Sequence, residues 1–442
     1  MPAEDGLERR LGLVSTASIV VANMVGAGIF TTSGLLMGDL GSPWLMLALW
    51  AGGGVIALCG ALCYGRLGAA IPRAGGEYAF LSRLFHPSLG FLSGWVSLFA
   101  GFSAPIAASA IGVAEYASRA APGLLGEEGS PESALLKKAC AMAVILAFTL
   151  IHLRGLELGA RVQNALTLLK VALVVGLVTW GFARGAGTLE HLSTPAGASP
   201  GWNTIGLSLM WIMFAYAGWN ASAYIGSEVR DPSRTLPRSL LLGTGAVIVL
   251  YLALNLFYLY AVPPADMAGV IPVAGLAVAR AFGEGAGSIV SAVVAFALFS
   301  SLSAYMILGP RVYFSMARDG YFFRFASEVS PRFGVPSKSI VLQGGLAMVM
   351  VMLGTFDQIL TYMGFSLGIF PILAVIGTFR LPRPGGERRP LLAGWVAPVV
   401  FVGASLAILT LAFFERPVES SIAIGMVLIG VPVFVAFARG RG

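Results

Sequence analysis

Two short glycine-containing segments lie inside long apolar stretches, and each could bind a ligand through its backbone. The first is NMVGAGIF, residues 23–30, in a stretch with no charge between Arg10 and Asp39. Unwinding at Gly26 to Gly28 would place free backbone amides at the start of the next half-helix. The helix dipole there favours an anion such as a carboxylate. The amides concerned are those of Ala27, Gly28 and Ile29.

The second segment is FAYAGWN, residues 214–220, also near the middle of an apolar stretch.

At the first break, a helix ending around Ala22 to Val25 would present carbonyl oxygens, which suit an ammonium group. An amino acid in its zwitterionic form fits both ends of that break. The alternative for the glycines is close packing of neighbouring helices. A dinucleotide-binding fingerprint is excluded, because Thr31 stands where its third glycine is required and no strand precedes it.

Lys170 lies inside an apolar stretch of roughly residues 160–180. Either end of this stretch is about 15 Å away at 1.5 Å per residue, which is too far for the side chain to reach water. Gln163, Thr167 and Lys170 share one helical face. We expect a functional role for Lys170, in which burial would let it release and regain a proton. The alternative is a structural cation held by carbonyl groups.

The elements that must position these residues are membrane spans. The 442-residue chain is 57% hydrophobic and 11% charged, with a mean hydropathy of +0.84, whereas soluble domains carry about 25% charged residues. The first apolar run is too long for a cleaved signal peptide, so we expect the N-terminus to be kept. Runs near the ~20 residues that cross a bilayer number twelve, beginning near positions 12, 44, 87, 137, 160, 203, 238, 286, 339, 357, 391 and 419.

The basic residues follow the alternation of these spans. If the N-terminus is inside, cytoplasmic segments hold 21 of the 28 lysines and arginines, while the acidic residues divide into ten inside and eleven outside. The positive-inside rule counts only lysine and arginine. The net charge of +7 therefore reports topology, with both termini cytoplasmic, and does not indicate nucleic-acid binding.

Other classes of function have little support in the sequence. No cofactor or metal is expected, and no grouping of catalytic side chains or phosphate-binding loop indicates an enzyme. A channel would need a pore lined by rings of charge or carbonyls. The paired breaks fit an alternating-access site better than such a pore. The cysteines fall in predicted spans and the histidines in three separate loops or loop edges: Cys59, Cys63, Cys140, His86, His152 and His191.

The two breaks fall in spans one and six, which are five spans apart. Transporters built from two inverted five-helix repeats interrupt the first helix of each repeat at the membrane midplane and bind substrate there. Irregular backbone at that depth is tolerated only where it is buried in protein or lines a water-filled cavity. The spacing of the breaks therefore predicts this plan.

Four ordered motifs carry a resemblance to a known family. They are NMVGAGIF, AAIPRAGGEYAFLSRLFHPSLGFLSGW, FAYAGWNASAYIGSEVRDPSRTLPRS and GPRVYFSMARDGYFFRFASEVSPRFGVPS. Together they resemble the amino acid, polyamine and organocation (APC) superfamily of transporters, and within it the bacterial type of the L-amino acid transporter branch. The resemblance covers residues 12 to about 380.

The resemblance implies an all-α integral membrane protein with a LeuT-like fold, twelve transmembrane helices and discontinuous helices 1 and 6. The chain, residues 1–442, would be a single transport domain. It would contain a first inverted repeat at residues 12–184, a second at 203–379, and two additional C-terminal helices at 391–438.

The resemblance also implies roles for matched residues. The amides of Ala27 and Gly28 would hold the substrate carboxylate, and Phe214 would be an aromatic gate. Lys170 would occupy the place of sodium in sodium-coupled relatives, so sodium independence is expected. The ammonium would bind carbonyls of Met24, Phe214 and Ala217, and the unwound part of span six would continue with Trp219 and Asn220.

Several positions depart from the family pattern or have a structural alternative. Ala27 replaces a common serine, so one hydroxyl contact is absent, and Arg66 stands where an acidic residue is usual and has no explanation from sequence. Residues 118–136 contain no cysteine, so no covalently linked heavy chain is expected. Phe214 and Trp219 could be packing residues, and Asn220 could be a helix cap. The motif residues interpreted as loop architecture or inner-gate ion pairs are Glu77, Glu228, Arg230 and Asp231.

The expected function is transport of neutral L-amino acids across the plasma (inner) membrane, by exchange or with protons. The centres of spans one, three, six, eight and ten contain no Asp, Glu, Lys or Arg, and an unpaired buried charge is costly. Cationic amino acids or polyamines are the alternative, because aromatic faces can bind cations.

Overall fold

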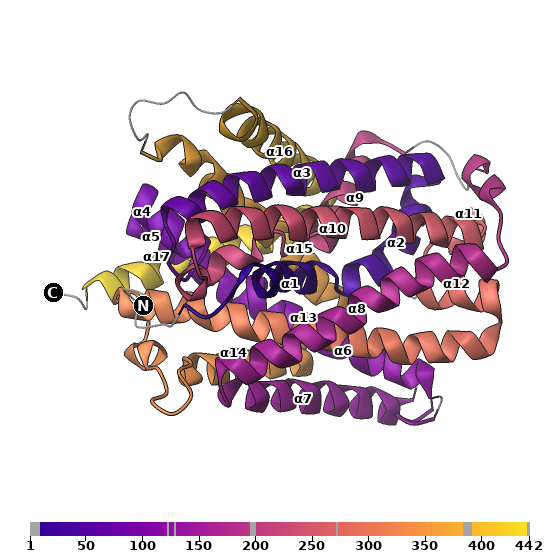
Figure 1. The fold of residues 1–442 in the computed structure, drawn as a ribbon, viewed down its shortest axis with the longest axis horizontal. Helices are drawn as coiled ribbons and strands as arrows, with labels where there is room; N and C mark the ends of the chain where they lie inside the picture. Colours follow the sequence, from indigo (N-terminus) through magenta and orange to yellow (C-terminus); the bar gives the residue numbers. More distant parts are fainter. Residues whose placement is uncertain are drawn as a thin grey trace.

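The computed structural model describes residues 9–121, 123–127, 130–194, 200–270, 273–354, 356–382 and 391–439. Within helices it leaves out the side chains of residues 27, 119, 156–163, 284, 356–358, 360–362, 364 and 419. Across the described ranges the protein is helical and forms no β-strand. Most long helices run along the long axis of the molecule, and α8 (Leu156–Arg184) crosses them obliquely (Figure 1).

Nine helical stretches of the described chain are long and apolar enough to cross a membrane. The protein is therefore a multi-pass membrane protein. Three further predicted spans coincide with shorter apolar helices, Trp202–Ala215, Ser337–Leu353 and Phe365–Arg380, so the count of twelve stays a prediction. The nine are Leu13–Leu40, Pro43–Ala70, Pro87–Ser118, Pro131–Leu153, Asn164–Arg184, Pro232–Ala261, Gly285–Arg318, Leu392–Glu415 and Ser420–Arg439.

Local sequence explains where many of these helices begin. Proline needs no backbone partner in the first turn of a helix, and it opens several of the long ones. Ser42 caps one by accepting from the Leu45 amide at 3.4 Å, and Ser130 caps another by accepting from the Ser133 amide at 3.1 Å. The helices begun by proline are α3 (Pro43–Ala70), α5 (Pro87–Val96), α7 (Pro131–Leu153), α10 (Pro232–Ala261) and α17 (Pro417–Arg439).

The first break separates α1 (Leu13–Met24) from α2 (Ala27–Leu40). It consists of Val25 and Gly26 alone, both in extended conformations. The predicted unwinding from Gly26 to Gly28 was too long, because Gly28 lies in the first turn of α2. A Cβ at Gly28 would stand 2.7 Å from the Ala215 Cα, so this glycine serves the close packing that was its alternative interpretation.

The second break is longer and differs in kind. Helix α9 (Trp202–Ala215) ends there, and two short 3-10 turns, Ala221–Tyr224 and Gly226–Glu228, precede α10. The α-helical inner half expected after this break is therefore absent from residues 216–231. Glycine is required at position 218, where the second break passes close to α1. Gly218 has φ +104°, and a Cβ there would lie 2.6 Å from the Asn23 Cβ.

A third irregularity was not predicted. Residues Ser97–Ser103 form a π-helical turn between α5 and α6 (Ala104–Ala120). Such turns occur frequently at functional sites. This turn lies beside the second break, because Ser97 and Phe102 line the same cavity as Asn220.

The end of the molecule that carries both termini (Figure 1) is closed by ion pairs. Arg311 of α13 (Glu284–Arg318) donates to Glu228 at 2.8 and 3.2 Å, and both side chains are buried. Arg311, which the sequence counts among the 21 cytoplasmic basic residues, lies within α13. Arg73 pairs with Asp319 at 3.2 Å. Glu228 therefore forms an ion pair, one of the two roles that its motif indicated.

Arg66, which the sequence left unexplained, has a structural role. Its guanidinium donates to the Ala393 carbonyl at 2.7 Å, at the π-helical turn Leu392–Val396 that leads into α16 (Ala397–Glu415). The side chain therefore joins α3 to the start of α16 and does not belong to the inner gate.

Candidate functional site

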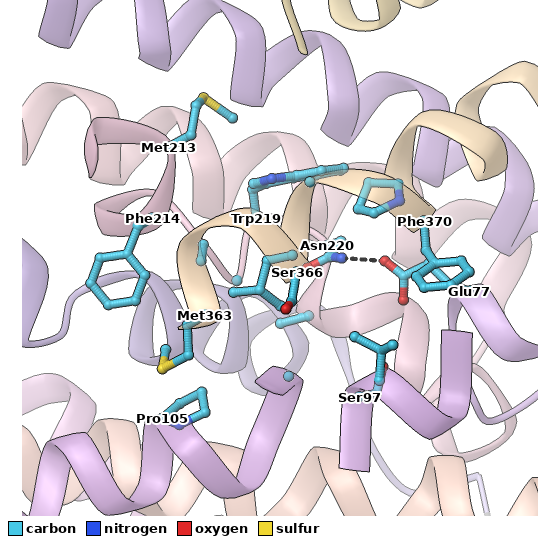
Figure 2. A pocket seen from close by; sticks show the side chains of 18 of the residues that line it. Glu77, Ser97, Pro105, Met213, Phe214, Trp219, Asn220, Met363, Ser366 and Phe370 are labelled. Atoms are coloured by element: carbon cyan, nitrogen blue, oxygen red, sulfur yellow. Dashed lines mark hydrogen bonds between the residues drawn. The ribbon is translucent and has the colours of Figure 1, made fainter. Parts of the chain in front are cut away.

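A cavity of about 130 Å³ lies beside the second break. A single water needs only about 10–15 Å³ on the same measure, so the cavity can hold a small solute. Its walls come from the second break, the π-helical turn, α15 (Phe356–Gly377) and α16. Figure 2 shows Phe214 at one end and Glu77 at the other, with Trp219 and Asn220 between them.

A second, smaller cavity of about 20 Å³ adjoins the first break. Gly26 and Gly28 line it, at the N-terminus of α2, where no side chain of the N-cap residue satisfies the amides. Phe214, Ala217 and Tyr305 line both cavities, so the two spaces are neighbours. The smaller cavity is the size of one or two waters, which makes it a narrow pocket in front of the α2 amides.

Lys170 is fully buried beside the first break. Its ammonium donates to the carbonyl oxygens of Ala22, at 3.1 Å, and Val25, and to the Ser301 hydroxyl at 2.9 Å. The carbonyls at the end of α1, interpreted from sequence as sites for a ligand ammonium, therefore bind the protein's own lysine. Thr167 contacts Ser300 on the same side of α8, at 3.3 Å. The side chain of Gln163, placed on this face by its spacing, lies outside the described residues.

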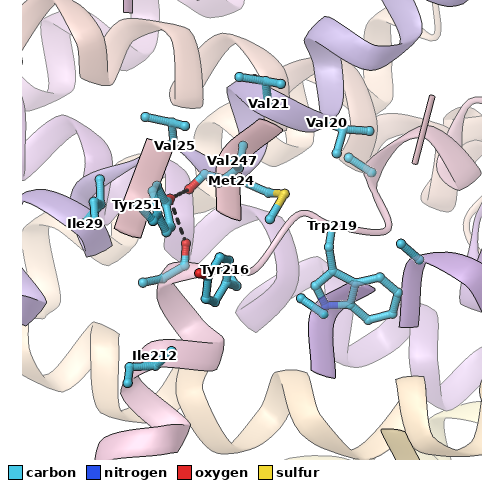
Figure 3. Packing of buried hydrophobic residues seen from close by; sticks show 14 of the residues in the cluster. Val20, Val21, Met24, Val25, Ile29, Ile212, Tyr216, Trp219, Val247 and Tyr251 are labelled. Atoms are coloured by element: carbon cyan, nitrogen blue, oxygen red, sulfur yellow. Dashed lines mark hydrogen bonds between the residues drawn. The ribbon is translucent and has the colours of Figure 1, made fainter. Parts of the chain in front are cut away.

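The carbonyl of Met24, a predicted ligand for the ammonium, also has a partner in the protein. Tyr251 of α10 donates its hydroxyl to the Met24 oxygen at 2.5 Å and lies 3.0 Å from the Ala215 oxygen (Figure 3). A carbonyl has two lone pairs, so one acceptor position of Met24 is still open. Tyr251 therefore connects the ends of both broken helices, and the Tyr305 hydroxyl reaches the neighbouring Asn23 oxygen at 3.3 Å.

The structure brings most of the predicted site residues to these two cavities. Met24, Gly26 and Gly28 line the smaller, and Phe214 and Ala217 line both. Trp219 and Asn220 line the larger. Ile29 is different, because its side chain is fully buried in the hydrophobic core (Figure 3) and only its amide belongs to the first turn of α2. The side chain of Ala27 lies outside the described residues.

Asn220 and Trp219 are held by contacts that the sequence did not reveal. The Asn220 side-chain amide donates to Glu77 at 2.7 Å, and the side chain makes no capping hydrogen bond to the 3-10 turn that follows it. The Trp219 ring makes edge contacts with Tyr64 and Phe401, with centroids 4.8 and 5.3 Å apart, and is therefore both packed and cavity-lining.

Glu77 is the site residue that sequence reasoning missed. It was interpreted as loop architecture, yet its side chain is only 3% exposed and lines the larger cavity. The available signal was a carboxylate directly after two glycines, Gly75 and Gly76, both with positive φ. The sequence also placed His152 at a loop edge, but it is buried in the last turn of α7 and lies 3.0 Å from the Ser303 hydroxyl.

An interrupted first span that meets a second irregular segment at cavities inside a multi-pass bundle is typical of membrane transport proteins. A family model described as an amino acid permease matches residues 11–437. The chain belongs to this family, within the APC superfamily that its four motifs resemble.

Known relatives agree with this assignment over nearly the whole chain. The Asc-type amino acid transporter 1 of Mus musculus is 28% identical, covering 97% of this chain and 81% of that protein. The human b(0,+)-type amino acid transporter 1 is 28% identical, covering 94% and 85%. The serine/threonine exchanger SteT of Bacillus subtilis is 26% identical and covers 99% of both chains.

Proposed function

We propose that this protein is a secondary active transporter that moves neutral L-amino acids across the plasma membrane by alternating access. The proposal includes a single domain of twelve spans, with inverted repeats at residues 12–184 and 203–379, two additional C-terminal helices at 391–438, and both termini in the cytoplasm. The relatives that support it include amino acid transporters and an exchanger of serine and threonine.

The observation that carries the proposal is the pairing of the two breaks around adjoining cavities. Gly26 and Gly28, at the start of α2, line the smaller cavity, where the helix dipole would favour a carboxylate. The carboxylate would accept from the amides of Ala27, Gly28 and Ile29. The ammonium would bind the carbonyls of Phe214 and Ala217 and the open acceptor position of Met24. The substrate side chain would then extend past Phe214 into the larger cavity.

The smaller cavity must widen before it can hold both charged groups of an amino acid. Its volume of about 20 Å³ corresponds to one or two waters. Phe214 and Tyr305 border both spaces, so a rotation of the Phe214 side chain would join them. This supports a gating role for Phe214.

Lys170 supports sodium independence. Its amino group occupies the space among the carbonyls of Ala22 and Val25 and the Ser301 hydroxyl, where a sodium ion would have to bind. A sodium ion and a charged Lys170 side chain in the same buried site would repel each other strongly. The protein would therefore work by exchange, or by proton coupling in which Lys170 changes charge.

Reconstitution into liposomes tests the proposed function. Labelled neutral amino acids should show counterflow that needs internal unlabelled substrate, that is unchanged by sodium, and that saturates. Tests with and without a pH gradient separate exchange from proton coupling. Failure of every amino acid while polyamines exchange would replace the proposal with the polyamine alternative, and unsaturable single-channel currents would replace it with a channel.

A further inference from the structure

Glu77 is held by donors from separate parts of the fold. Its Oε1 accepts from the Tyr64 hydroxyl of α3 and from the Asn220 amide of the second break, both at 2.7 Å. Its Oε2 accepts from the Tyr224 hydroxyl. Asn220 also donates to the Tyr224 hydroxyl at 3.4 Å. Glu77 itself opens α4 (Glu77–Leu84). The carboxylate therefore joins three elements at one point.

The donors around Glu77 carry no charge. Among the described residues, no lysine or arginine forms an ion pair with it, and its side chain is 3% exposed. Three of its roughly four acceptor positions are occupied. A carboxylate satisfied in this way is poorly suited to bind a ligand cation, because a new partner would have to displace an existing hydrogen bond. Its contacts fit a positioning role better.

The loop before Glu77 is attached to the same segment of the second break. The Gly75 amide donates to the Tyr224 oxygen at 3.0 Å, and the Ala74 amide donates to the Ser227 hydroxyl at 2.8 Å. Beyond this segment, Ser315 of α13 donates to the Ala74 oxygen at 3.1 Å. The loop thus connects the second break to the end of the molecule that the Arg311–Glu228 ion pair closes.

The same cluster also reaches the larger cavity. The Tyr64 ring contacts Trp219, and the Tyr224 ring contacts Phe102, with centroids 4.8 and 5.3 Å apart. Trp219, Phe102 and Asn220 all line the cavity. A ligand that moves Asn220 would act directly on its hydrogen bond to Glu77 (Figure 2), and one that moves Trp219 or Phe102 would act through the rings of Tyr64 and Tyr224.

We propose that Glu77 is a positioning residue that couples occupation of the larger cavity to opening of the end that carries the termini. Its three hydrogen bonds hold the second break closed against α3 and α4, and they break together when that end opens. The inference rests on the proposed alternating access. Glu77 would then control the rate at which that end opens, and it would not contribute to substrate affinity.

The test compares Glu77→Gln with its parent in a background where Cys59, Cys63 and Cys140 are replaced and Ser97→Cys supplies one thiol in the cavity wall. Labelling by a polar maleimide in detergent measures opening, and it does not depend on which substrate is carried. We expect labelling at least fivefold faster in Glu77→Gln. Exchange in liposomes should show a maximal rate changed at least fivefold and a KM within about twofold of the parent.

Tyr64→Phe is the second variant, because it removes one of the three hydrogen bonds and keeps the ring contacts. It should change labelling in the same direction by a smaller factor. Tyr260→Phe is the matched control, since its hydroxyl donates to the Gly185 oxygen at 3.2 Å near the end of α10; it should leave labelling unchanged.

Two results would overturn the inference. Unchanged labelling and maximal rate in Glu77→Gln, with a raised KM for cationic substrates alone, would make Glu77 a cation-binding residue. Equal effects of Tyr64→Phe and Tyr260→Phe on labelling and thermal stability would reduce it to a fold-stabilising residue. If the parent exchanges no amino acid but the labelling differences appear, the proposed function fails and the role of Glu77 stands.

Discussion

The two breaks differ in length and in the way they are held. The first is confined to Val25 and Gly26 and has an α-helix on each side. The second extends over residues 216–231 and contains only short 3-10 turns before α10 begins. The first break therefore leaves few backbone groups outside a helix, while the second is a longer segment held by both backbone and side-chain hydrogen bonds.

The partners of the two breaks reinforce this difference. Around the first, Lys170, Ser301 and Tyr251 bind backbone oxygens of α1 or of its end. Around the second, Glu77 binds the side chains of Asn220 and Tyr224, in addition to backbone bonds such as that from Gly75 to Tyr224. Side-chain contacts can be exchanged without changing the backbone path. We therefore expect the first break to serve binding and the second to move.

The largest expected effect comes from adding one methyl group beside the first break. In Gly28→Ala the new Cβ would lie 2.7 Å from the Ala215 Cα and 2.8 Å from its Cβ. Overpacking typically costs about 1–3 kcal/mol, and backbone atoms cannot move aside as a side chain can. We expect little folded protein by size-exclusion chromatography and no exchange.

Gly52→Ala is the matched control for this substitution. Gly52 is also helical, but a Cβ there would have no neighbour within 4 Å, and alanine is favoured over glycine inside helices by about 0.5–1 kcal/mol. It should express and transport as the parent does. Normal folding of Gly28→Ala would show that the backbone at the first break moves easily. The first break would then be no more rigid than the second.

Lys170→Ala should have the next largest effect. It leaves the oxygens of Ala22 and Val25 without the ammonium they accept from, and a buried unsatisfied group costs about 1–3 kcal/mol. We expect exchange to fall at least about tenfold, since 1.4 kcal/mol corresponds to a factor of ten. Counterflow that is independent of pH in the parent and intact in Lys170→Ala would exclude proton coupling through this residue.

Local signals explain which parts of this site could be predicted from the sequence. Glycines inside an apolar run and a lysine far from either end of a span are unusual wherever they occur, so Gly26, the segment 214–220 and Lys170 could be singled out without a structure. The exact extent of the first break could not, because whether Gly28 unwinds or packs depends on Ala215, which is far away in the chain.

The residues that were missed depend on distant partners. Glu77 meets Tyr64 and Asn220, which are 13 and 143 positions away, and in sequence it looks like an ordinary loop residue. Ser301 is one of many serines in an apolar helix, and only the fold places it beside Lys170. Nine apolar helices of membrane-spanning length in the described chain could be predicted because hydropathy is local, whereas pairing between helices is not.

Tyr251→Phe tests whether the two breaks act together. The change removes the hydroxyl that contacts both the Met24 and the Ala215 oxygens, and it keeps the ring that packs on Trp50 and Tyr216. Each hydrogen bond contributes about 0.5–1.5 kcal/mol, so a loss of about two- to tenfold in transport is expected. Affinity and maximal rate should both fall, measured by concentration series in liposomes. A change in only one of them would mean that Tyr251 serves a single break.

The smallest effects should separate the breaks most cleanly. Ser301→Ala removes a hydroxyl 2.9 Å from the Val25 oxygen, and Ser222→Ala removes one 3.1 Å from the Ser239 hydroxyl in the second break. Ser222→Ala costs about one hydrogen bond, and Ser301→Ala also removes the one that its hydroxyl accepts from Lys170, so changes of about two- to fivefold are expected, with the larger in Ser301→Ala. Because the first break would position the binding amides, Ser301→Ala should raise the KM; because the second would move, Ser222→Ala should alter the maximal rate. The same kinetic pattern in both variants would mean that the breaks do not divide binding and movement between them.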